Sequence, residues 1–124
     1  MEKFDIILTV CPPWGSPSVP IGLAYLASYL KDKKLNPKVL DLNLEVFDNL
    51  SNEGFEKYWL SRYCKHWSDQ KLFCEFIKNI PEQIEYCVGR LLSFGTEIIG
   101  FSINQSNRNF SVVIAQELKK EMKS

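Results

Sequence analysis

The sequence contains few of the residues that build metal centres. His66 is the one histidine, and the four cysteines, at positions 11, 64, 74 and 87, include no CxxC pair. This spacing argues against a zinc site or an iron–sulfur cluster made by this chain alone. Without a secretory signal a disulfide framework is not expected either, so we expect reduced and mostly buried cysteines. We therefore assign no metal-binding residue.

Long apolar runs and a net charge are also missing. No run approaches the roughly 18 to 20 apolar residues that span a bilayer. The start, Met1-Glu2-Lys3, leads directly into a strand-like segment, which does not fit a signal peptide. Fifteen basic side chains balance fifteen acidic ones, so no overall field attracts nucleic acid or an anionic membrane. With 45% hydrophobic and 24% charged residues, the composition predicts a globular cytoplasmic protein that binds neither nucleic acid nor a membrane.

The first forty residues predict a strand, a helix and a second strand. Residues 4–10 are a nearly continuous apolar and β-branched run, typical of a parallel strand buried on both faces. A proline-rich loop at 11–19 separates this strand from a helix expected over 20–34. Residues 37–42 predict the second strand. Segments of these lengths form a right-handed βαβ unit.

Residues 45–94 differ in character from the rest of the chain. Their apolar residues follow a helical period, and Phe55, Trp59, Tyr63 and Trp67 recur at every fourth position. A crossover helix needs only about 10 to 15 residues, so this stretch predicts an expanded helical insertion. We expect the aromatic stripe to pack in the core, with a lid or a partner surface as the open alternative.

The remaining residues predict a third strand at 97–102, a loop rich in amides and hydroxyls at 103–109, and a final amphipathic helix. With the first strand central, the expected fold is α/β: a flavodoxin-like or Rossmann-like three-layer parallel sheet of order 2-1-3. Such sheets usually have about five or six strands, so we expect residues 1–124 to be one domain that is truncated, with completion of the sheet by another chain or domain as the alternative.

Ligands of an open α/β sheet bind at the carboxyl ends of its strands, which places any site in three segments. These are the loop 11–19, residues 41–43 and the loop 103–109. A nucleotide is disfavoured, because the first loop has neither a GxGxxG pattern nor a Walker lysine and Asp41 alone is weak support for a ribose.

Four sequence blocks resemble a known family. They are CPPWG at 11–15, VPIGLAYLASYLK at 19–31, VLDLN at 39–43 and IIGFS at 98–102. Together they resemble the cobalamin-binding-type domain that precedes the catalytic core in many radical SAM enzymes. The resemblance covers residues 4–43 and 96–120, and the insertion has no counterpart in it.

This resemblance implies a fold whose strand ends carry the lower face and nucleotide tail of cobalamin. It also implies a downstream radical SAM domain as partner, where S-adenosylmethionine and a 4Fe–4S cluster are bound. Two features depart from the family. The DxHxxG motif of the better known cobalamin carriers is replaced by Pro-Pro-Trp, so cobalt would have no histidine ligand from this loop, and the fourth strand with its glycines is absent. Ser102 matches the serine that follows the family's third strand.

The cofactor-binding candidates are the residues of the three strand-end segments that suit a corrin ringed by carboxamides. Amides and hydroxyls suit such a ligand better than charges, and an indole ring could cover a corrin face. The alternative interpretation is that the asparagines and serines cap the last helix and that the tryptophan is a packing residue. The candidates are Pro12, Pro13, Trp14, Gly15, Asp41, Asn43, Ser102, Asn104, Gln105 and Ser106.

The predicted function is therefore that of a cobalamin-binding-type accessory domain of a radical SAM enzyme, such as a methyltransferase or a related enzyme. The domain contributes to cofactor or substrate binding, and no residue is assigned a catalytic role. The alternative is a degenerate module of the same fold that binds no cobalamin and serves a structural or protein-interaction role.

Overall fold

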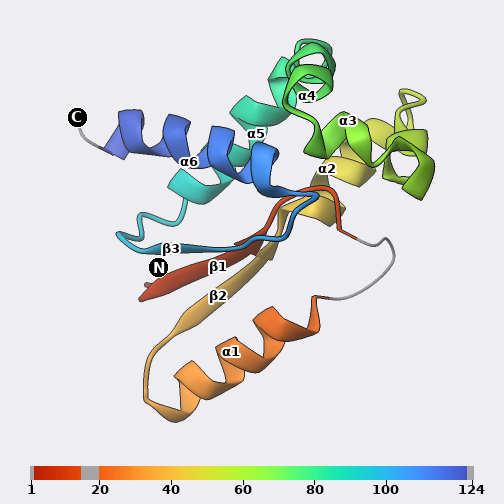
Figure 1. The fold of residues 1–124 in the computed structure, drawn as a ribbon. Coiled ribbons are helices and arrows are strands. Elements are labelled where there is room, and N and C mark those ends of the chain that lie inside the picture. Colours follow the sequence, from red (N-terminus) through yellow and green to blue (C-terminus); the bar gives the residue numbers. More distant parts are fainter. Residues whose placement is uncertain (1, 15–19, 123–124) are drawn as a thin grey trace.

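The computed structural model describes residues 2–14 and 20–122 and contains a three-stranded parallel sheet of order β2-β1-β3 (Figure 1). The strands are β1 (Ile6–Val10), β2 (Pro37–Asp41) and β3 (Ile99–Ser102). In the register, Leu8 lies opposite Val39 on one side and Gly100 on the other. The predicted α/β fold with the first strand central is confirmed.

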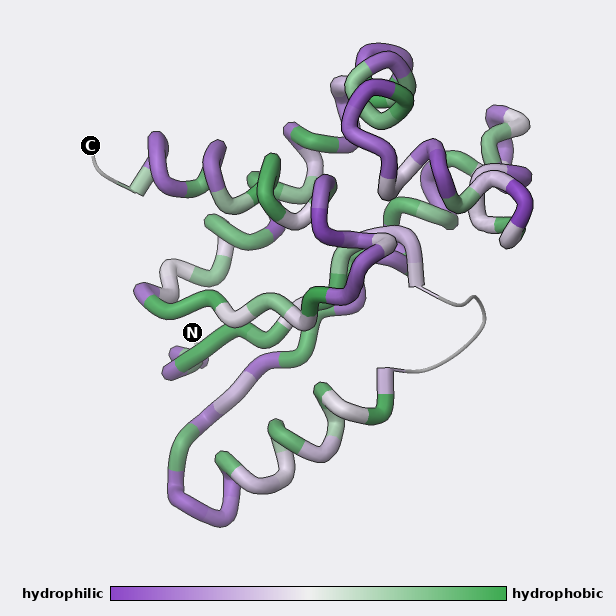
Figure 2. Tube along the Cα trace, viewed as in Figure 1, coloured by the Kyte–Doolittle hydropathy of each residue, from purple (hydrophilic) through white to green (hydrophobic). Residues whose placement is uncertain are grey.

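Helices cover the two faces of the sheet unequally (Figure 1). On one face α1 (Ile21–Asp32) packs Leu23 and Ala27 against Leu8 and Val10 of β1. The opposite face carries the larger core, to which α2 (Leu42–Ser51), α5 (Pro81–Leu92) and α6 (Arg108–Met122) contribute. This division follows from the alternation of side chains along a strand. Figure 2 shows that β1 is hydrophobic along nearly its whole length.

The second crossover is helical, but its details differ from the prediction. β2 ends at Asp41 and α2 begins at the next residue, so the helical part starts at 42 and not at about 45. After α2 come two 3-10 turns and two short helices. Their bounds are η1 (Glu56–Trp59), η2 (Ser61–Tyr63), α3 (Lys65–Ser68) and α4 (Gln70–Ile77).

The aromatic stripe at every fourth residue is not the face of one helix. The backbone becomes extended at Leu60 (ψ 146°) and at Asp69 (ψ 125°), which breaks the segment into short pieces. The rings meet because the chain folds back on itself. The ring centroids of Trp59 and Trp67 lie 5.1 Å apart, and those of Trp67 and Phe76 lie 5.0 Å apart. The expected packing role is confirmed for Trp67, which is fully buried.

The predicted ends of the other helices are close to those observed. α1 follows Pro20, and Gly95, just after α5, has the left-handed φ of 63° that favours glycine after a helix. Among residues 2–14 and 20–122 no helix has both the length and the apolar character of a membrane span.

Candidate functional site

Asn43 joins the loop after β1 to the helical insertion. It lies in the first turn of α2, with only 2% of its surface exposed. Its Oδ1 accepts hydrogen bonds from the backbone N–H of Trp14 (2.9 Å) and from Nε1 of Trp59 (2.7 Å). Its Nδ2 donates to the carbonyl oxygen of Trp14 (3.3 Å). Because three of its hydrogen-bonding positions are used within the protein, Asn43 fixes the backbone of Trp14 and the indole of Trp59, so at most one N–H of its Nδ2 is available to a ligand.

Asn107 holds the loop after β3 in a similar way. It is fully buried, and its Nδ2 donates to the carbonyl oxygens of Ser102 (3.1 Å) and Cys11 (3.3 Å). Its Oδ1 accepts from the backbone N–H of Asn104, while its own N–H donates to Oδ1 of Asn104, both at 2.8 Å. This reciprocal pair closes the turn before α6 and ties it to the end of β1. The alternative interpretation, in which the amides of this loop hold local structure and do not bind a ligand, therefore applies to Asn107 and, in part, to Asn104.

Asp41 caps a helix. Its Oδ1 accepts from the backbone N–H of Leu44 (2.9 Å), which satisfies one of the free donors at the start of α2. Partial burial raises the pKa of the Asp41 carboxyl, against the lowering effect of the hydrogen bond from Leu44. The position that a ribose or a cofactor would use is thus engaged in local structure.

A cavity of about 240 Å³ lies at the carboxyl ends of the strands, between the predicted loops and the insertion. Four of the ten predicted site residues line it, and the rest of the wall comes from the insertion. None of the lining side chains is charged. They are Pro13, Trp14, Asn104 and Ser106 from the predicted set, and Tyr58, Trp59, Leu60, Ser61, Cys64 and Trp67 from the insertion.

The other described residues of the predicted set do not line this cavity. Pro12 is buried and is joined to Pro13 by a cis peptide bond. Ser102 is half-buried and its carbonyl accepts from Asn107, whereas Gln105 is exposed. Gly15 lies outside the described residues.

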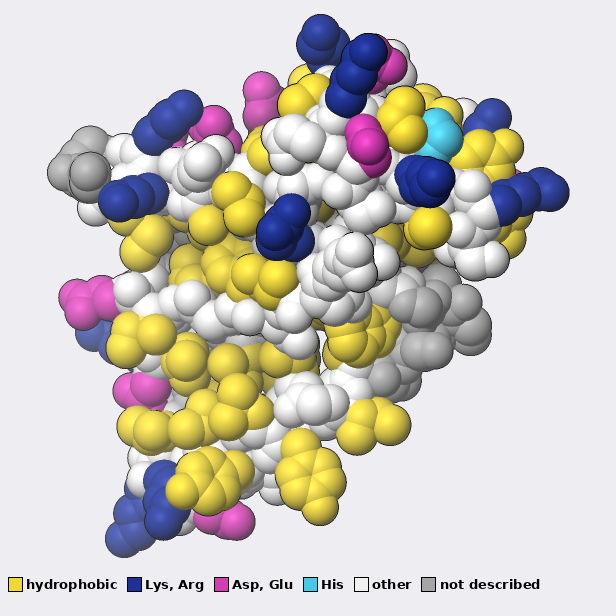
Figure 3. Space-filling model, in the orientation of Figure 1, with side chains coloured by type: hydrophobic (Ala, Val, Ile, Leu, Met, Phe, Trp, Pro, Cys, Tyr) yellow, Lys and Arg dark blue, Asp and Glu magenta, His cyan; other side chains and the backbone are white. Residues whose placement is uncertain are grey.

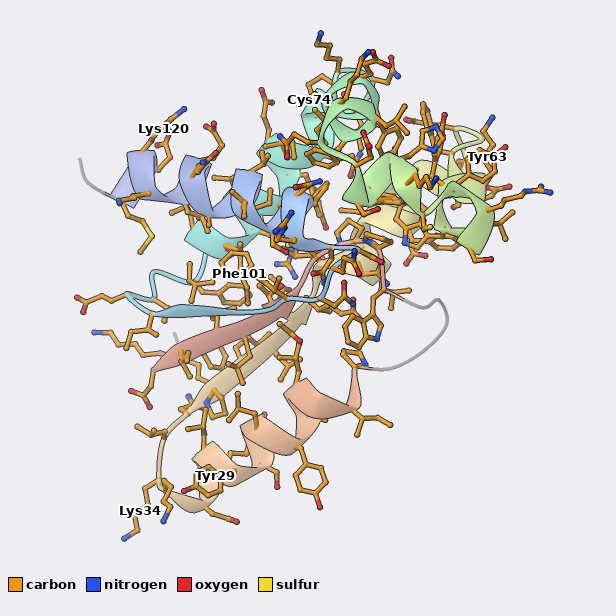
Figure 4. All side chains as sticks on the ribbon, viewed as in Figure 1. Tyr29, Lys34, Tyr63, Cys74, Phe101 and Lys120 are labelled. Carbon is orange, nitrogen blue, oxygen red and sulfur yellow. The ribbon has the colours of Figure 1, made fainter. Side chains whose placement is uncertain are left out.

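One further contact, from α6, fixes the insertion over the strand ends, and another inside the insertion holds its short pieces together. Nδ2 of Asn109, in the first turn of α6, donates to the carbonyl oxygens of Trp67 (2.9 Å) and Ser68 (3.2 Å) at the end of α3. Nε1 of Trp67 donates to the carbonyl oxygen of Tyr58 (2.6 Å). In Figure 4 the labelled Tyr63 stands out on the insertion beside these short helices, away from Phe101 on β3.

The predicted site residues include none from the insertion, because its aromatic stripe was expected to pack in the core and a lid was only the open alternative. Sequence reasoning also missed Asn107, which stands in the same amide-rich loop as Asn104. Buried and exposed amides in one loop look alike in a sequence. The one available signal was the nearby pairing of two asparagines, which is typical of a closed turn.

A cobalt or other metal ligand set is not formed by the described residues: no group of three histidine, cysteine or acidic side chains lies together in them. His66 packs against the rings of Tyr58 (5.2 Å) and Tyr63 (5.5 Å) and does not line the cavity. All four cysteines are free, with Cys64 and Cys74 exposed and the other two buried. The expectation of mostly buried cysteines therefore holds for half of them.

A larger hollow of about 680 Å³ lies at the opposite end of the sheet. It is lined by residues 2–5, which precede β1, and by residues 93–98, which precede β3. Parallel sheets bind ligands at the carboxyl ends of their strands, and this hollow is at the amino ends. We therefore place the candidate site at the smaller cavity.

The cavity that the described residues form at the strand ends is small for cobalamin. Small-molecule sites commonly occupy about 300–1,000 Å³, and a corrin with its side chains belongs to the larger ligands of this range. The 240 Å³ found here is smaller, and the indole of Trp59 lies over the strand ends where a corrin would need room. The resemblance to cobalamin-binding-type domains stays a prediction, because no family model, curated protein or solved structure matches this chain.

Proposed function

We propose that the chain is an accessory domain of cobalamin-binding type in a radical SAM enzyme, and that its strand-end cavity positions a small neutral group of the substrate in place of cobalamin. The accessory role rests on the sequence blocks at 11–31, 39–43 and 98–102. The replacement of cobalamin by a small group rests on one observation. Asn43 forms hydrogen bonds with both Trp14 and Trp59, and these bonds hold the insertion over the carboxyl ends of the strands.

Two buried amides at the strand ends are engaged within the protein. Asn43 and Asn107 make three side-chain hydrogen bonds each within the protein. To bind a corrin, the domain would have to break the hydrogen bond between Asn43 and Trp59. That would leave buried polar groups without partners, at a cost of roughly 1–3 kcal/mol each.

The wall of the cavity suits a planar, uncharged group. The indole and phenol rings offer flat apolar faces, and Ser61, Asn104 and Ser106 offer hydroxyl and amide groups at the rim. None of the described residues that line the cavity is charged, so a phosphate or carboxylate would find no counter-charge among them. An aromatic or conjugated amide is the class of group that matches this wall.

Titration with hydroxocobalamin tests the proposal that this domain does not bind cobalamin. We expect the visible spectrum of hydroxocobalamin to be unchanged by the protein and the two to separate on gel filtration. A spectral change together with co-elution at a stoichiometry of one would contradict the proposal.

Titration with benzamide tests whether the cavity still binds a ligand. We expect saturable quenching of tryptophan fluorescence with a dissociation constant of roughly 1–10 mM, typical of so small a ligand. The effect should be lost in Trp59→Ala. If benzamide gives no saturable quenching and hydroxocobalamin does not bind, the second candidate is favoured, a purely structural or protein-interaction module. The tight aromatic packing of Trp67 and Phe76 is the observation that supports this second candidate.

A further inference from the structure

Basic side chains are concentrated in the segments that form the cavity at the strand ends. Residues 57–68, which include all the cavity-lining residues of the insertion, contain three basic residues and no acidic one. Residues 103–116, which follow β3, contain one basic residue and again no acidic one. Because the whole chain is electrically balanced, the remainder is acidic overall, so the positive charge is local. The four basic residues are Lys57, Arg62, Lys65 and Arg108.

These four cations are not neutralised within the protein. All four side chains are exposed, and none of them forms an ion pair with another residue of the segments 2–14 and 20–122. Figure 3 shows dark-blue side chains spread over the insertion on the visible face, with fewer acidic ones among them. Unpaired surface cations that lie close together attract anions from solution. The insertion therefore presents a positive surface next to an uncharged cavity.

Two of the cations converge on one ring beside the cavity wall. Nζ of Lys57 lies 5.8 Å from the ring centroid of Tyr63, and Cζ of Arg62 lies 5.6 Å from it. Nζ of Lys57 also lies 5.5 Å from the ring centroid of Tyr58, which lines the cavity. The rings of Tyr58 and Tyr63 are 5.3 Å apart, and Figure 4 shows Tyr63 standing out on the insertion. The positive charge thus begins where the aromatic wall of the cavity ends.

The size of the cavity divides a ligand into two parts. Its 240 Å³ lies below the roughly 300–1,000 Å³ that accommodate most whole ligands, so only the planar head of a larger compound enters. The remainder of that compound stays outside and meets the basic side chains. A neutral planar head with a negatively charged tail satisfies both surfaces.

The charges favour a phosphate as the tail. A carboxylate carries one negative charge, whereas a phosphate monoester carries about 1.5 to 2 at pH 7 and has three acceptor oxygens. Lysine and arginine both bind such a group well. Aromatic faces that stack a base, together with basic side chains that bind its phosphate, are the combination found on surfaces that bind single nucleotides or single strands. The absence of a GxGxxG or Walker pattern concerns phosphates bound at a helix N-terminus, not phosphates bound by side chains.

We propose that the ligand of the strand-end cavity is a nucleotide, whose base enters the cavity beside Trp14 and Trp59 and whose phosphate binds the basic side chains of the insertion. This inference rests on the proposed function, since it names the class of compound that carries the planar group. A free nucleotide and the end of a single-stranded nucleic acid share this chemistry.

The test follows the indole N–H signal of Trp59 by NMR in the full chain. The protein is titrated at low salt with uridine, with uridine 5′-monophosphate and with single-stranded tetrauridylate. We expect the monophosphate to bind roughly tenfold more tightly than uridine, and about 0.5 M salt to remove most of this difference. Tighter binding of tetrauridylate than of the monophosphate would identify a single strand as the source, and equal binding a free nucleotide.

Two lysine variants with matched surroundings provide the control. Nζ of Lys33 lies 5.5 Å from the ring of Tyr29, just as that of Lys57 lies from Tyr58, but Lys33 follows α1 at the amino end of the sheet. The measured quantity is the ratio of the affinities for the monophosphate and for uridine, because a distorted cavity changes both. Lys57→Glu should lower this ratio about fivefold or more, and Lys33→Glu should leave it unchanged.

Three results would overturn the inference: a ratio of one in the unaltered protein, equal effects of the two variants, or a hexaglutamate peptide that binds as tightly as tetrauridylate. The last result would assign the positive surface to an acidic protein partner. If uridine and benzamide bind and the ratio is one, only this inference fails. If both leave the Trp59 signal unmoved, the cavity takes no planar group, and the proposed function fails together with the inference.

Discussion

Replacing Asn107 by alanine should destabilise the protein strongly, although no predicted ligand contact is lost. The side chain is fully buried and makes three hydrogen bonds, to the N–H of Asn104 and to the carbonyl oxygens of Ser102 and Cys11. Alanine replaces none of them. The loop after β3 would lose its tie to the end of β1, and both segments carry residues that line the cavity.

The expected magnitude follows from the number of bonds. Each contributes roughly 0.5–1.5 kcal/mol net, so the free energy of unfolding should fall by about 3 kcal/mol. Domains of this size are stable by about 5–15 kcal/mol, so the loss is a large fraction of the total. With an m value of about 2 kcal/mol per M urea, the unfolding midpoint should fall by about 1.5 M.

Urea unfolding followed by circular dichroism and tryptophan fluorescence measures this change. Asn104→Ala is the matched control, because Asn104 is exposed and its side chain accepts one hydrogen bond, from the N–H of Asn107. Asn104→Ala should lower the free energy of unfolding by about 1 kcal/mol at most. If both variants shift the midpoint equally, the buried amide of Asn107 is not what holds the loop.

Two further predictions concern charge and thiol reactivity. Burial alone would raise the pKa of Glu45, but the hydrogen bonds from Arg90 and Tyr86 and the charge of Arg90 outweigh it and lower the pKa. The stabilisation is therefore present above the unfolded pKa of about 4.3 and is lost as pH falls through the folded value. Glu45→Gln should cost at most about 1 kcal/mol of unfolding free energy at pH 7, because the pair is partly exposed, and less as the pH falls below the unfolded pKa. A cost in urea unfolding that does not fall between pH 7 and pH 3 would refute the ion pair. Burial raises the pKa of Cys11 to about 12 and also raises that of Cys87, so a disulfide reagent should modify two thiols rapidly in the native protein and four after unfolding. Rapid modification of all four in the native protein would contradict this burial.

The sheet could be predicted because its strands carry strong local signals. The run at 4–10 is apolar on both faces, and only a parallel strand between two helical layers buries both. The order with β1 central is what the resemblance to cobalamin-binding-type domains implies, because right-handed crossovers alone do not fix it. The helix of α1 followed from its proline start and its apolar period.

The candidate site was only partly predictable, because its walls are set by tertiary contacts. The spacing of Trp59 and Trp67 fits a helix, but the chain turns at Leu60 and the two rings meet across that turn. Asn43 fits a ligand amide equally well by type. Only its burial next to Trp14 and Trp59 makes it a structural residue, and no local pattern carries that information.

The insertion is held over the strand ends by the hydrogen bond between Nε1 of Trp59 and Oδ1 of Asn43, and a double-mutant cycle tests this most directly. The cycle combines Asn43→Ala with Trp59→Phe, which keeps an aromatic ring but removes the donor. Urea unfolding should give a coupling energy of about 1–2 kcal/mol between the two sites, whereas the pair Asn49→Ala and Trp59→Phe should give none. A coupling energy of zero between Asn43 and Trp59 would contradict a closed strand end and would reopen the site to a larger ligand.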